Sequence, residues 1–204
     1  MAERIVVVGN GRWPNELLWA DLIASADKVV ALDGAADRIN CDVVIGDLDS
    51  WSGNGNQEVI KIEGQEDTDL AKALKRFDVN DIVGIEGGRL DHRLAAFTAL
   101  FESNSSATIH LEGWKARRVP SSGIEIKVNI GVNISLFAFG KVVNIHTSGL
   151  LHPLAGNDLE TSTRGVHNEA TSNDVRINHD GGDLLVIWQV DLSLCGEGGK
   201  FSLM

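Results

Sequence analysis

The first half of the chain alternates short aliphatic runs with segments of helical periodicity, and this alternation constrains the fold most. Runs with few polar residues cover residues 4–9, 28–32, 42–46, 58–62, 81–86 and 107–111. Continuous Val/Ile runs are typical of parallel strands covered on both faces. Amphipathic helical spacing recurs between them in residues 14–25, 68–77 and 92–102. The sequence therefore predicts an α/β fold with a doubly wound, mainly parallel sheet, helices on both faces, and a ligand site at the carboxyl ends of the strands.

The second half changes character near residues 112–120. Helical periodicity disappears, and strand-like pieces separated by Gly, Asn, Asp and Ser follow at residues 125–130, 133–139, 141–147, 174–179 and 183–190. This pattern predicts a smaller C-terminal antiparallel β-sandwich or barrel. We therefore expect an α/β domain over residues 1–114 and an all-β domain over residues 115–204.

The 204 residues carry a formal net charge of −11, and the acidity lies in the first half. Residues 1–112 hold 20 Asp and Glu against 10 Lys and Arg, whereas residues 113–204 hold 9 against 8. Surface solvation explains such acidity, and a metal site or a cationic substrate would also concentrate it in one domain. The absence of a basic stripe disfavours nucleic-acid binding. No leader-like or membrane-spanning apolar run is present, so we expect a cytoplasmic protein without membrane contact.

Two carboxylates follow directly after the aliphatic run 42–46. Asp47 and Asp49 are separated by one residue, so both can reach one hard cation from a turn. Ordinary turn chemistry explains an Asp-x-Asp pair as well. Both interpretations stay open at this point.

A second acidic segment, Gln65–Asp69, precedes and opens the predicted helix 68–77. Helix chemistry explains part of it, because Asp67 suits the N-cap and Asp69 can pair with Lys72 three residues later. Capping needs one or two acids. Three acids in four residues indicate an additional role.

The segment Gly87–His92 lies between a predicted strand and a predicted helix. Its two glycines permit positive φ, the helix N-terminus attracts phosphate oxygens, and Arg89 adds a planar fork of donors. These features indicate an anion-binding site, although a tight turn capped by Asp91 would use the same residues. Asp33–Gly34 follows yet another strand. Four strands of the predicted parallel sheet are thus each followed by a segment that bears carboxylates. This recurrence favours a shared ligand site over four unrelated turns.

Taken in order, these motifs resemble those of the thiamin pyrophosphokinase family. The matching segments are Asp33–Ala36, Asp42–Ser50, Thr68–Asp69, Gly87–His92, Gly149–Leu154, Ser162–Glu169 and Gly182–Ile187. The family transfers a diphosphoryl group from ATP to the hydroxyl of thiamin, giving thiamin diphosphate and AMP, with Mg²⁺. The resemblance therefore implies a Mg²⁺-dependent thiamin diphosphokinase. It also implies a homodimer whose thiamin site lies between the α/β domain of one subunit and the β domain of another.

The resemblance implies a role for each matching residue. The metal ligands would be Asp47, Asp49 and Glu66. Asp69 would flank the nucleotide phosphates, Arg89 would meet the developing phosphate charge, and Asp91 would orient or deprotonate the thiamin hydroxyl. The remaining ATP-binding residues would be Asp33, Gly34, Gln65, Thr68, Gly87, Gly88 and His92. The thiamin-binding residues would be His152, Thr163, His167 and Asn168.

The chain departs from the family pattern at some of these positions. Glu66 stands where Asp is commoner, His152 replaces an aromatic residue, and His167 replaces a serine. Two alternatives therefore remain beside the thiamin enzyme. One is a diphosphokinase acting on another hydroxymethyl heterocycle, such as a pterin, and the other is a catalytically silent nucleotide or thiamin binder. The intact Asp47, Asp49 and Arg89 count against the silent binder.

Overall fold

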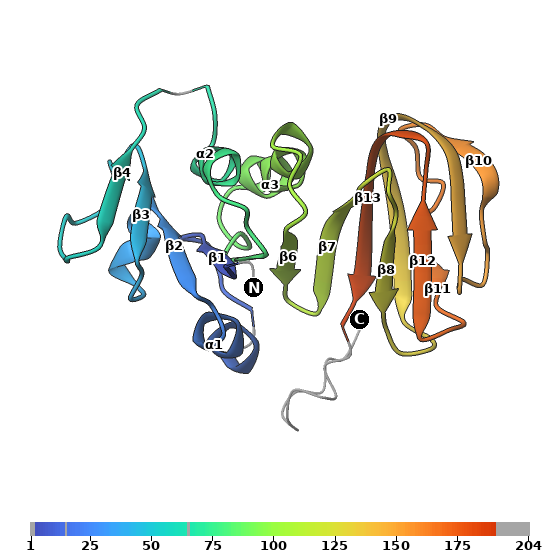
Figure 1. Ribbon diagram of the computed structural model, residues 1–204, viewed down its shortest axis with the longest axis horizontal. Helices are drawn as coiled ribbons and strands as arrows, with labels where there is room; N and C mark the ends of the chain where they lie inside the picture. Colours follow the sequence, from blue (N-terminus) through green and yellow to red (C-terminus); the bar gives the residue numbers. More distant parts are fainter. Residues whose placement is uncertain (1–2, 15, 65, 191–204) are drawn as a thin grey trace.

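A parallel sheet forms the first half of the protein, as the aliphatic runs predict. The computed structural model describes residues 3–14, 16–64 and 66–190. Six parallel strands lie side by side in the order β4 (Glu58–Lys61), β3 (Val43–Gly46), β2 (Lys28–Leu32), β1 (Ile5–Val8), β5 (Asp81–Val83) and β6 (Thr108–Leu111) (Figure 1). The chain builds outward from β1 to β4 and then returns to the other side of β1 with β5. This reversal is the topological switch point of a doubly wound sheet.

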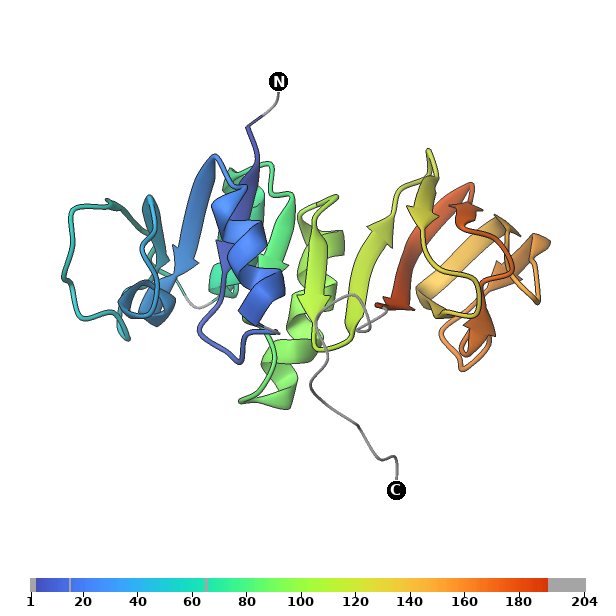
Figure 2. The ribbon, with the colours of Figure 1, turned by 90° about the horizontal axis from the view of Figure 1, so that it is seen from below.

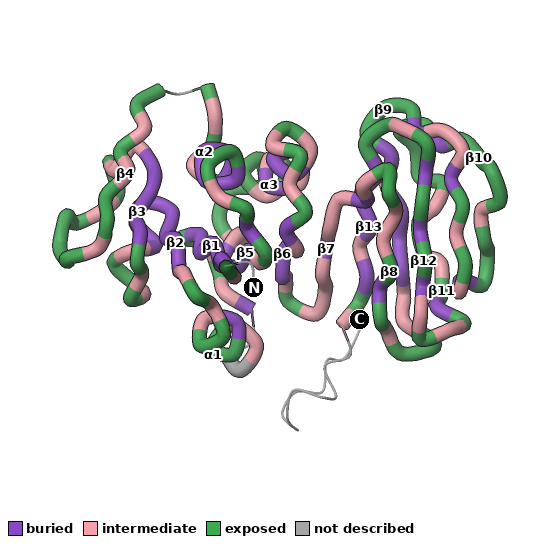
Figure 3. Tube along the Cα trace, viewed as in Figure 1, coloured by how far each residue is buried: buried purple, intermediate pink, exposed green. Residues whose placement is uncertain are grey.

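Helices cover both faces of this parallel part. The α1 helix (Glu16–Ala24) lies on one face, while α2 (Asp69–Arg76) and α3 (Leu90–Glu102) lie on the other (Figures 1 and 2). Alternate residues of β1 pack in two separate hydrophobic clusters. Val7 belongs to the cluster that contains Leu74 and Leu100, and Val6 belongs to the cluster that contains Leu22. The central strands are therefore buried on both faces (Figure 3), which explains their unbroken aliphatic sequence.

The second half consists of antiparallel strands around a separate core. Its described strands are β7 (Trp114–Val119), β8 (Ile124–Lys127), β9 (Asn133–Ser148), β10 (Ala155–Leu159), β11 (Asn168–Glu169), β12 (Asp174–Asn178) and β13 (Gly181–Gln189). The long β9 strand pairs with β13 through its first part and with β10 and β12 through its second. Inward-facing residues such as Ile134, Ile145 and Leu184 form the core of this half.

The two halves share one sheet across the predicted boundary at residue 114. Strands β6 and β7 form an antiparallel hairpin. Strand β7 also pairs with β13, and β13 pairs with β9, so the described strands make a continuous mixed sheet. Two expected strands, residues 133–139 and 141–147, are one strand in the structure. Residues Asp33–Asp37 form a short 3₁₀ helix, η1, and β7, β10 and β11 are additional to the predicted strands.

The Asp81 carboxylate at the start of β5 contacts His110 of β6 and Arg4, the residue before β1. The carboxylate of Asp81 lies 2.7 Å from Nε2 of His110 and accepts a hydrogen bond from Nη2 of Arg4 at 2.9 Å. Burial alone would raise the pKa of Asp81, but the hydrogen bonds from His110 and Arg4 outweigh it and lower the pKa. The ionised form of Asp81 is therefore the stable one in the fold.

Within the described part of the chain, no helix has the length and apolar character needed to cross a membrane.

Candidate active site

A cavity of about 780 Å³ opens at the switch point of the parallel sheet. The loops after β1 and β5 meet there: the amide of Gly9 donates to the carbonyl of Val83 at 2.8 Å, and the amide of Gly11 donates to the carbonyl of Gly84 at 2.7 Å. The cavity is lined from the carboxyl ends of the strands and from the starts of α2 and α3. This is the place where the sequence predicts ligand binding.

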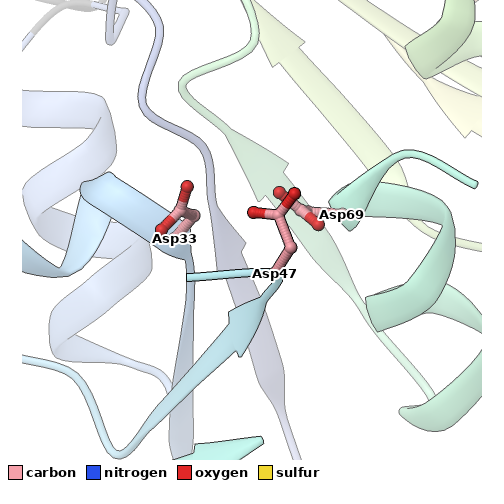
Figure 4. A group of neighbouring side chains, drawn as sticks. All are labelled: Asp33, Asp47 and Asp69. Atoms are coloured by element: carbon pink, nitrogen blue, oxygen red, sulfur yellow. The ribbon is translucent and has the colours of Figure 1, made fainter. Parts of the chain in front are cut away.

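Three carboxylates converge in this cavity from different elements (Figure 4). Asp33 follows β2, Asp47 follows β3, and Asp69 opens α2. Each offers one oxygen atom, and these three atoms lie within 4.8 Å of one another. A set of carboxylate oxygens suits a hard divalent cation such as Mg²⁺. We call these three residues the carboxylate triad.

The backbone around the triad is shaped to bring the carboxylates together. Asp33 has a φ of 45°, a left-handed conformation that aspartate tolerates better than most residues. Gly46 has a φ of 153°, and a Cβ atom there would lie 3.1 Å from the carboxylate of Asp69. Glycine at position 46 therefore lets the start of α2 approach the end of β3.

The Asp33 carboxyl group has a raised pKa. Its burial is the largest cause, and the neighbouring charges of Asp49 and Asp69 act in the same direction. Hydrogen bonds from Ser50 oppose the shift, since the amide of Ser50 donates to Asp33 at 3.2–3.3 Å. Closely spaced negative charge is thus a property of the site, and a bound cation would relieve it.

The predicted metal ligands share the cavity but not one cluster. Asp47 belongs to the triad, whereas Asp49 and Glu66 line the cavity outside it. Asp49 accepts a hydrogen bond from Oγ of Ser50 at 2.9 Å. The set of Asp47, Asp49 and Glu66 therefore stays a prediction, and the triad is an alternative set that the fold brings together.

The start of α2 differs from its sequence prediction at the N-cap. Thr68 is the N-cap, and its hydroxyl accepts a hydrogen bond from the amide of Ala71 at 3.2 Å. Asp67 does not fill this role but pairs with Lys75 at 2.9 Å. The hydrogen bond from Lys75 is the main cause of the lowered pKa of Asp67. The predicted pair of Asp69 and Lys72 is confirmed, at 3.0 Å.

The loop before α3 carries an exposed ion pair. Nε of Arg89 donates to both carboxylate oxygens of Asp91 at 3.1 Å, and the backbone amide of His92 donates to Asp91 at 2.9 Å. The hydrogen bond from Arg89 is the main cause that lowers the pKa of Asp91 to about 2. Arg89 is the N-cap residue of α3, so Asp91 is not the cap but lies in the first turn.

Most of the predicted nucleotide-binding residues meet in this one cavity. Its lining includes Asp33, Gly34, Thr68, Asp69, Gly87, Gly88, Arg89 and His92. Gln65 lies outside the described residues. The cavity also includes Asn10, Ser50 and Lys72, to which the sequence assigns no ligand role. Asn10 lies two residues after the end of β1, so the rule that ligands bind at strand ends could have identified it.

The predicted thiamin-binding residues lie in the other half of the protein. The backbone amide of His152 donates to the side chain of Asn168 at 3.0 Å, and the Asn168 amide donates back to the carbonyl of His152 at 2.8 Å. The amide of His167 donates to Oγ of Ser135 at 3.1 Å. Thr163, like His152 and His167, is exposed.

One chain does not bring the two sets of residues together. The described residues that line the cavity end at Ala96. Strand β9, against which β11 and Asn168 pair, lies seven strand positions from β3 in the sheet. At about 4.8 Å per strand, this separation is on the order of 30 Å, and Figure 1 shows β3 and β9 far apart in the sheet.

Comparisons with known proteins identify the family and the folds that this chain resembles. Residues 19–111 match the sequence model of the family described as thiamin pyrophosphokinase, catalytic domain. The fold is similar to thiamine pyrophosphokinase from Bacillus subtilis, with a TM-score of 0.76 and 22% identity over 93% of this chain and 100% of the other. It is also similar to thiamin pyrophosphokinase from Candida albicans, with a TM-score of 0.77 and 12% identity over 93% and 90% of the two chains.

The resemblance to the thiamin pyrophosphokinase family is thereby confirmed. The fold is also similar to that of yeast thiamin pyrophosphokinase, with a TM-score of 0.69 and 14% identity over 95% of this chain and 88% of the other. No curated protein matches the chain by sequence. At these identities the solved structures establish a shared fold, and the match over residues 19–111 contains most of the residues that line the cavity.

Proposed function

We propose that this protein is a Mg²⁺-dependent thiamin diphosphokinase, which transfers a diphosphoryl group from ATP to the hydroxyl of thiamin. One observation carries the proposal: the carboxylate triad and the Arg89 loop line the same cavity at the switch point. The first is suited to a divalent cation and the second to phosphate oxygens. Residues 19–111, which contain both, match the thiamin pyrophosphokinase catalytic domain.

The reaction breaks one phosphorus–oxygen bond, forms another, and releases the hydroxyl proton. The thiamin hydroxyl oxygen attacks the β-phosphorus of ATP, the bond from that phosphorus to the oxygen bridging the α- and β-phosphates breaks, and AMP leaves. The hydroxyl proton is lost to solvent or to a carboxylate. Such transfers depend mainly on positioning and charge neutralisation. Mg²⁺ held by residues of the triad would supply part of that neutralisation.

Arg89 and Asp91 have different tasks in this scheme. The guanidinium group of Arg89 presents a fork of donors to the phosphate oxygens, which carry increasing charge during transfer. Asp91, with a pKa of about 2, is ionised at neutral pH and is a weak proton acceptor. We therefore assign Asp91 to holding Arg89 and orienting the thiamin hydroxyl rather than to general-base catalysis.

We further propose that the protein acts as a homodimer in which the second subunit supplies the thiamin-binding residues. The separation of these residues from the cavity supports this arrangement. Mixing Asp47→Asn and His152→Ala proteins, at a thiamin concentration at which neither turns over alone, tests it, because a mixed dimer would contain one intact site. Recovery of about a quarter of the wild-type activity is expected after subunit exchange. No recovery despite exchange would place both sets of residues in one subunit's site.

The decisive assay combines the protein with ATP, Mg²⁺ and thiamin. Appearance of AMP and thiamin diphosphate is expected, whereas ADP would indicate transfer of a single phosphoryl group. The exposed His152 and His167 depart from the family pattern, so hydroxymethyl pterins are tested as acceptors in parallel. Preference for a pterin would replace thiamin in the proposal, and binding of ATP without AMP release would indicate a silent binder. Because the reaction consumes ATP, we also propose a cytoplasmic location.

A further inference from the structure

A buried lysine stands beside the carboxylate triad. Lys72 lies on the first half of α2, its side chain is 6% exposed, and it lines the cavity. Its Nζ atom donates to Oδ1 of Asp69 at 3.0 Å. Lysine is rarely buried to this degree unless it is paired with an opposite charge. Lys75, one turn later on the same helix, is 41% exposed and lies outside the cavity lining.

The ammonium group of Lys72 places a positive charge next to the triad, independently of any bound cation. The three carboxylate oxygens lie within 4.8 Å of one another, so ionised carboxylates at these positions repel each other. The ammonium group of Lys72 attracts Asp69 and offsets part of this repulsion. A divalent cation that binds the triad must approach this ammonium group, and two positive charges in a poorly solvated site repel each other.

We propose that Lys72 is a positioning residue that makes metal binding depend on the nucleotide. Its charge weakens binding of a divalent cation alone, since it occupies an oxygen of Asp69 and repels the cation. A nucleoside triphosphate brings negative oxygens, which the ammonium group attracts once Asp69 is shared with the cation. Lys72 therefore strengthens binding of the metal–nucleotide complex. This inference rests on the proposed function only in requiring that the cavity binds a divalent cation and a nucleoside triphosphate.

The test measures two affinities by titration calorimetry on the Lys72→Met protein. The first probe is Mg²⁺ or Mn²⁺ alone, and the second is α,β-methylene-ATP with saturating metal, in which the bond broken by the reaction cannot break. Compared with wild type, we expect Lys72→Met to bind the metal alone about tenfold more tightly and the analogue about tenfold more weakly. The reason is that the ammonium charge of Lys72 repels the cation but attracts the phosphate oxygens. Lys72→Arg, which keeps the charge, should stay within about threefold of wild type in both measurements.

Lys75→Met is the matched control. This substitution removes the same charge from the same helix. The Lys75 side chain pairs with Asp67 and Glu102, which are not members of the triad. Both affinities should remain within about twofold of wild type, as expected for an exposed charge screened by solvent. An equal change in Lys72→Met and Lys75→Met would show an effect of net charge and would overturn the specific role of Lys72.

Other results overturn the inference directly. Weaker binding of both probes to Lys72→Met would make Lys72 a structural support of the cavity, and unchanged binding would remove it from the site. If Lys72→Met does not fold, Lys72→Gln replaces it, because the amide can still donate to Asp69 without the charge. The outcome is independent of catalysis: a wild-type protein that binds both probes but releases no AMP would refute the proposed function and leave this test valid.

Discussion

Replacing Gly84 by alanine tests whether the close approach of β1 and β5 maintains the cavity. Gly84 has a φ of 77°, and a Cβ atom there would lie 2.3 Å from the carbonyl oxygen of Gly9 and 2.8 Å from the indole of Trp13. The left-handed conformation costs a non-glycine residue about 1–2 kcal/mol. Relieving the clash requires a shift of the Gly9 backbone, and overpacking of this kind costs about 1–3 kcal/mol more. We expect a total loss of about 2–5 kcal/mol in the free energy of unfolding.

Gly53→Ala separates the two contributions. Gly53 has a φ of 79°, nearly that of Gly84, but a Cβ atom there would meet nothing within 4 Å. It should therefore lose only the conformational part, about 1–2 kcal/mol. Urea unfolding of both variants gives the difference, which isolates the contact with Gly9.

Binding of α,β-methylene-ATP gives a second measure of the Gly84 substitution. A displaced Gly9–Gly11 loop should weaken the analogue about tenfold or more in Gly84→Ala, while Gly53→Ala binds normally. Equal stability losses in the two variants, together with unchanged analogue binding, would refute the view that this backbone contact shapes the cavity.

Four further substitutions address the site and the sheet. Asp47→Asn should lower kcat by about 100-fold or more while the unfolding curve is retained, because it removes a carboxylate of the triad; near-normal turnover would exclude Asp47 from the mechanism. Arg89→Lys should lower kcat about tenfold because it loses the planar fork, and a large stability loss with full activity would make Arg89 structural. His152→Trp should lower the thiamin KM a few-fold by adding a stacking face and leave the ATP KM unchanged; an unaltered thiamin KM would place His152 outside the acceptor site. Asp81→Asn should lose about 1–3 kcal/mol at pH 7. Because the pKa of Asp81 is lowered below 3.8, the stability that its ionised form contributes is present above about pH 3.8 and lost as the pH falls through the lowered pKa; an unfolding difference between wild type and Asp81→Asn that does not change with pH would contradict this origin.

The sequence predicts the parallel half well because burial on both faces leaves a strong signal. The run 28–32 coincides with β2, and the helical repeat over residues 68–77 corresponds to α2, Asp69–Arg76. The second half is harder to predict. Strand β9 contains Gly140 at a φ of 85°, and a glycine between two apolar runs predicts a turn rather than one continuous strand. Strand β10, AGNDL, is exposed except at Leu159 and has no apolar alternation to indicate a strand.

The site, too, can be predicted only in part: the sequence shows which carboxylates lie at the ends of elements, but not which of them come together in space. The positions of Asp33, Asp47 and Asp69 at the ends or starts of elements are visible in the sequence. Which carboxylates converge depends on the order of the strands and on side-chain direction, which local pattern does not encode. Asp47 and Asp49 lie on one turn, yet Asp47 joins the triad and Asp49 does not. Lys72 appears in the sequence as an ordinary helix-surface partner of Asp69, because its burial comes from the packing of α2 on the sheet.

The place of β13 in the sheet has a consequence for how the protein is made. This last described strand lies between β7 and β9, pairing with Trp114–Val119 on one side and with residues 134–143 on the other. On the ribosome, strands β1 to β6 are complete once residue 111 has emerged, so the parallel half can fold early. The facing edges of β7 and β9 stay unpaired until residue 189 has been synthesised, and unpaired edges attract other chains. Nascent chains that stall between these points should therefore be the species most prone to aggregate.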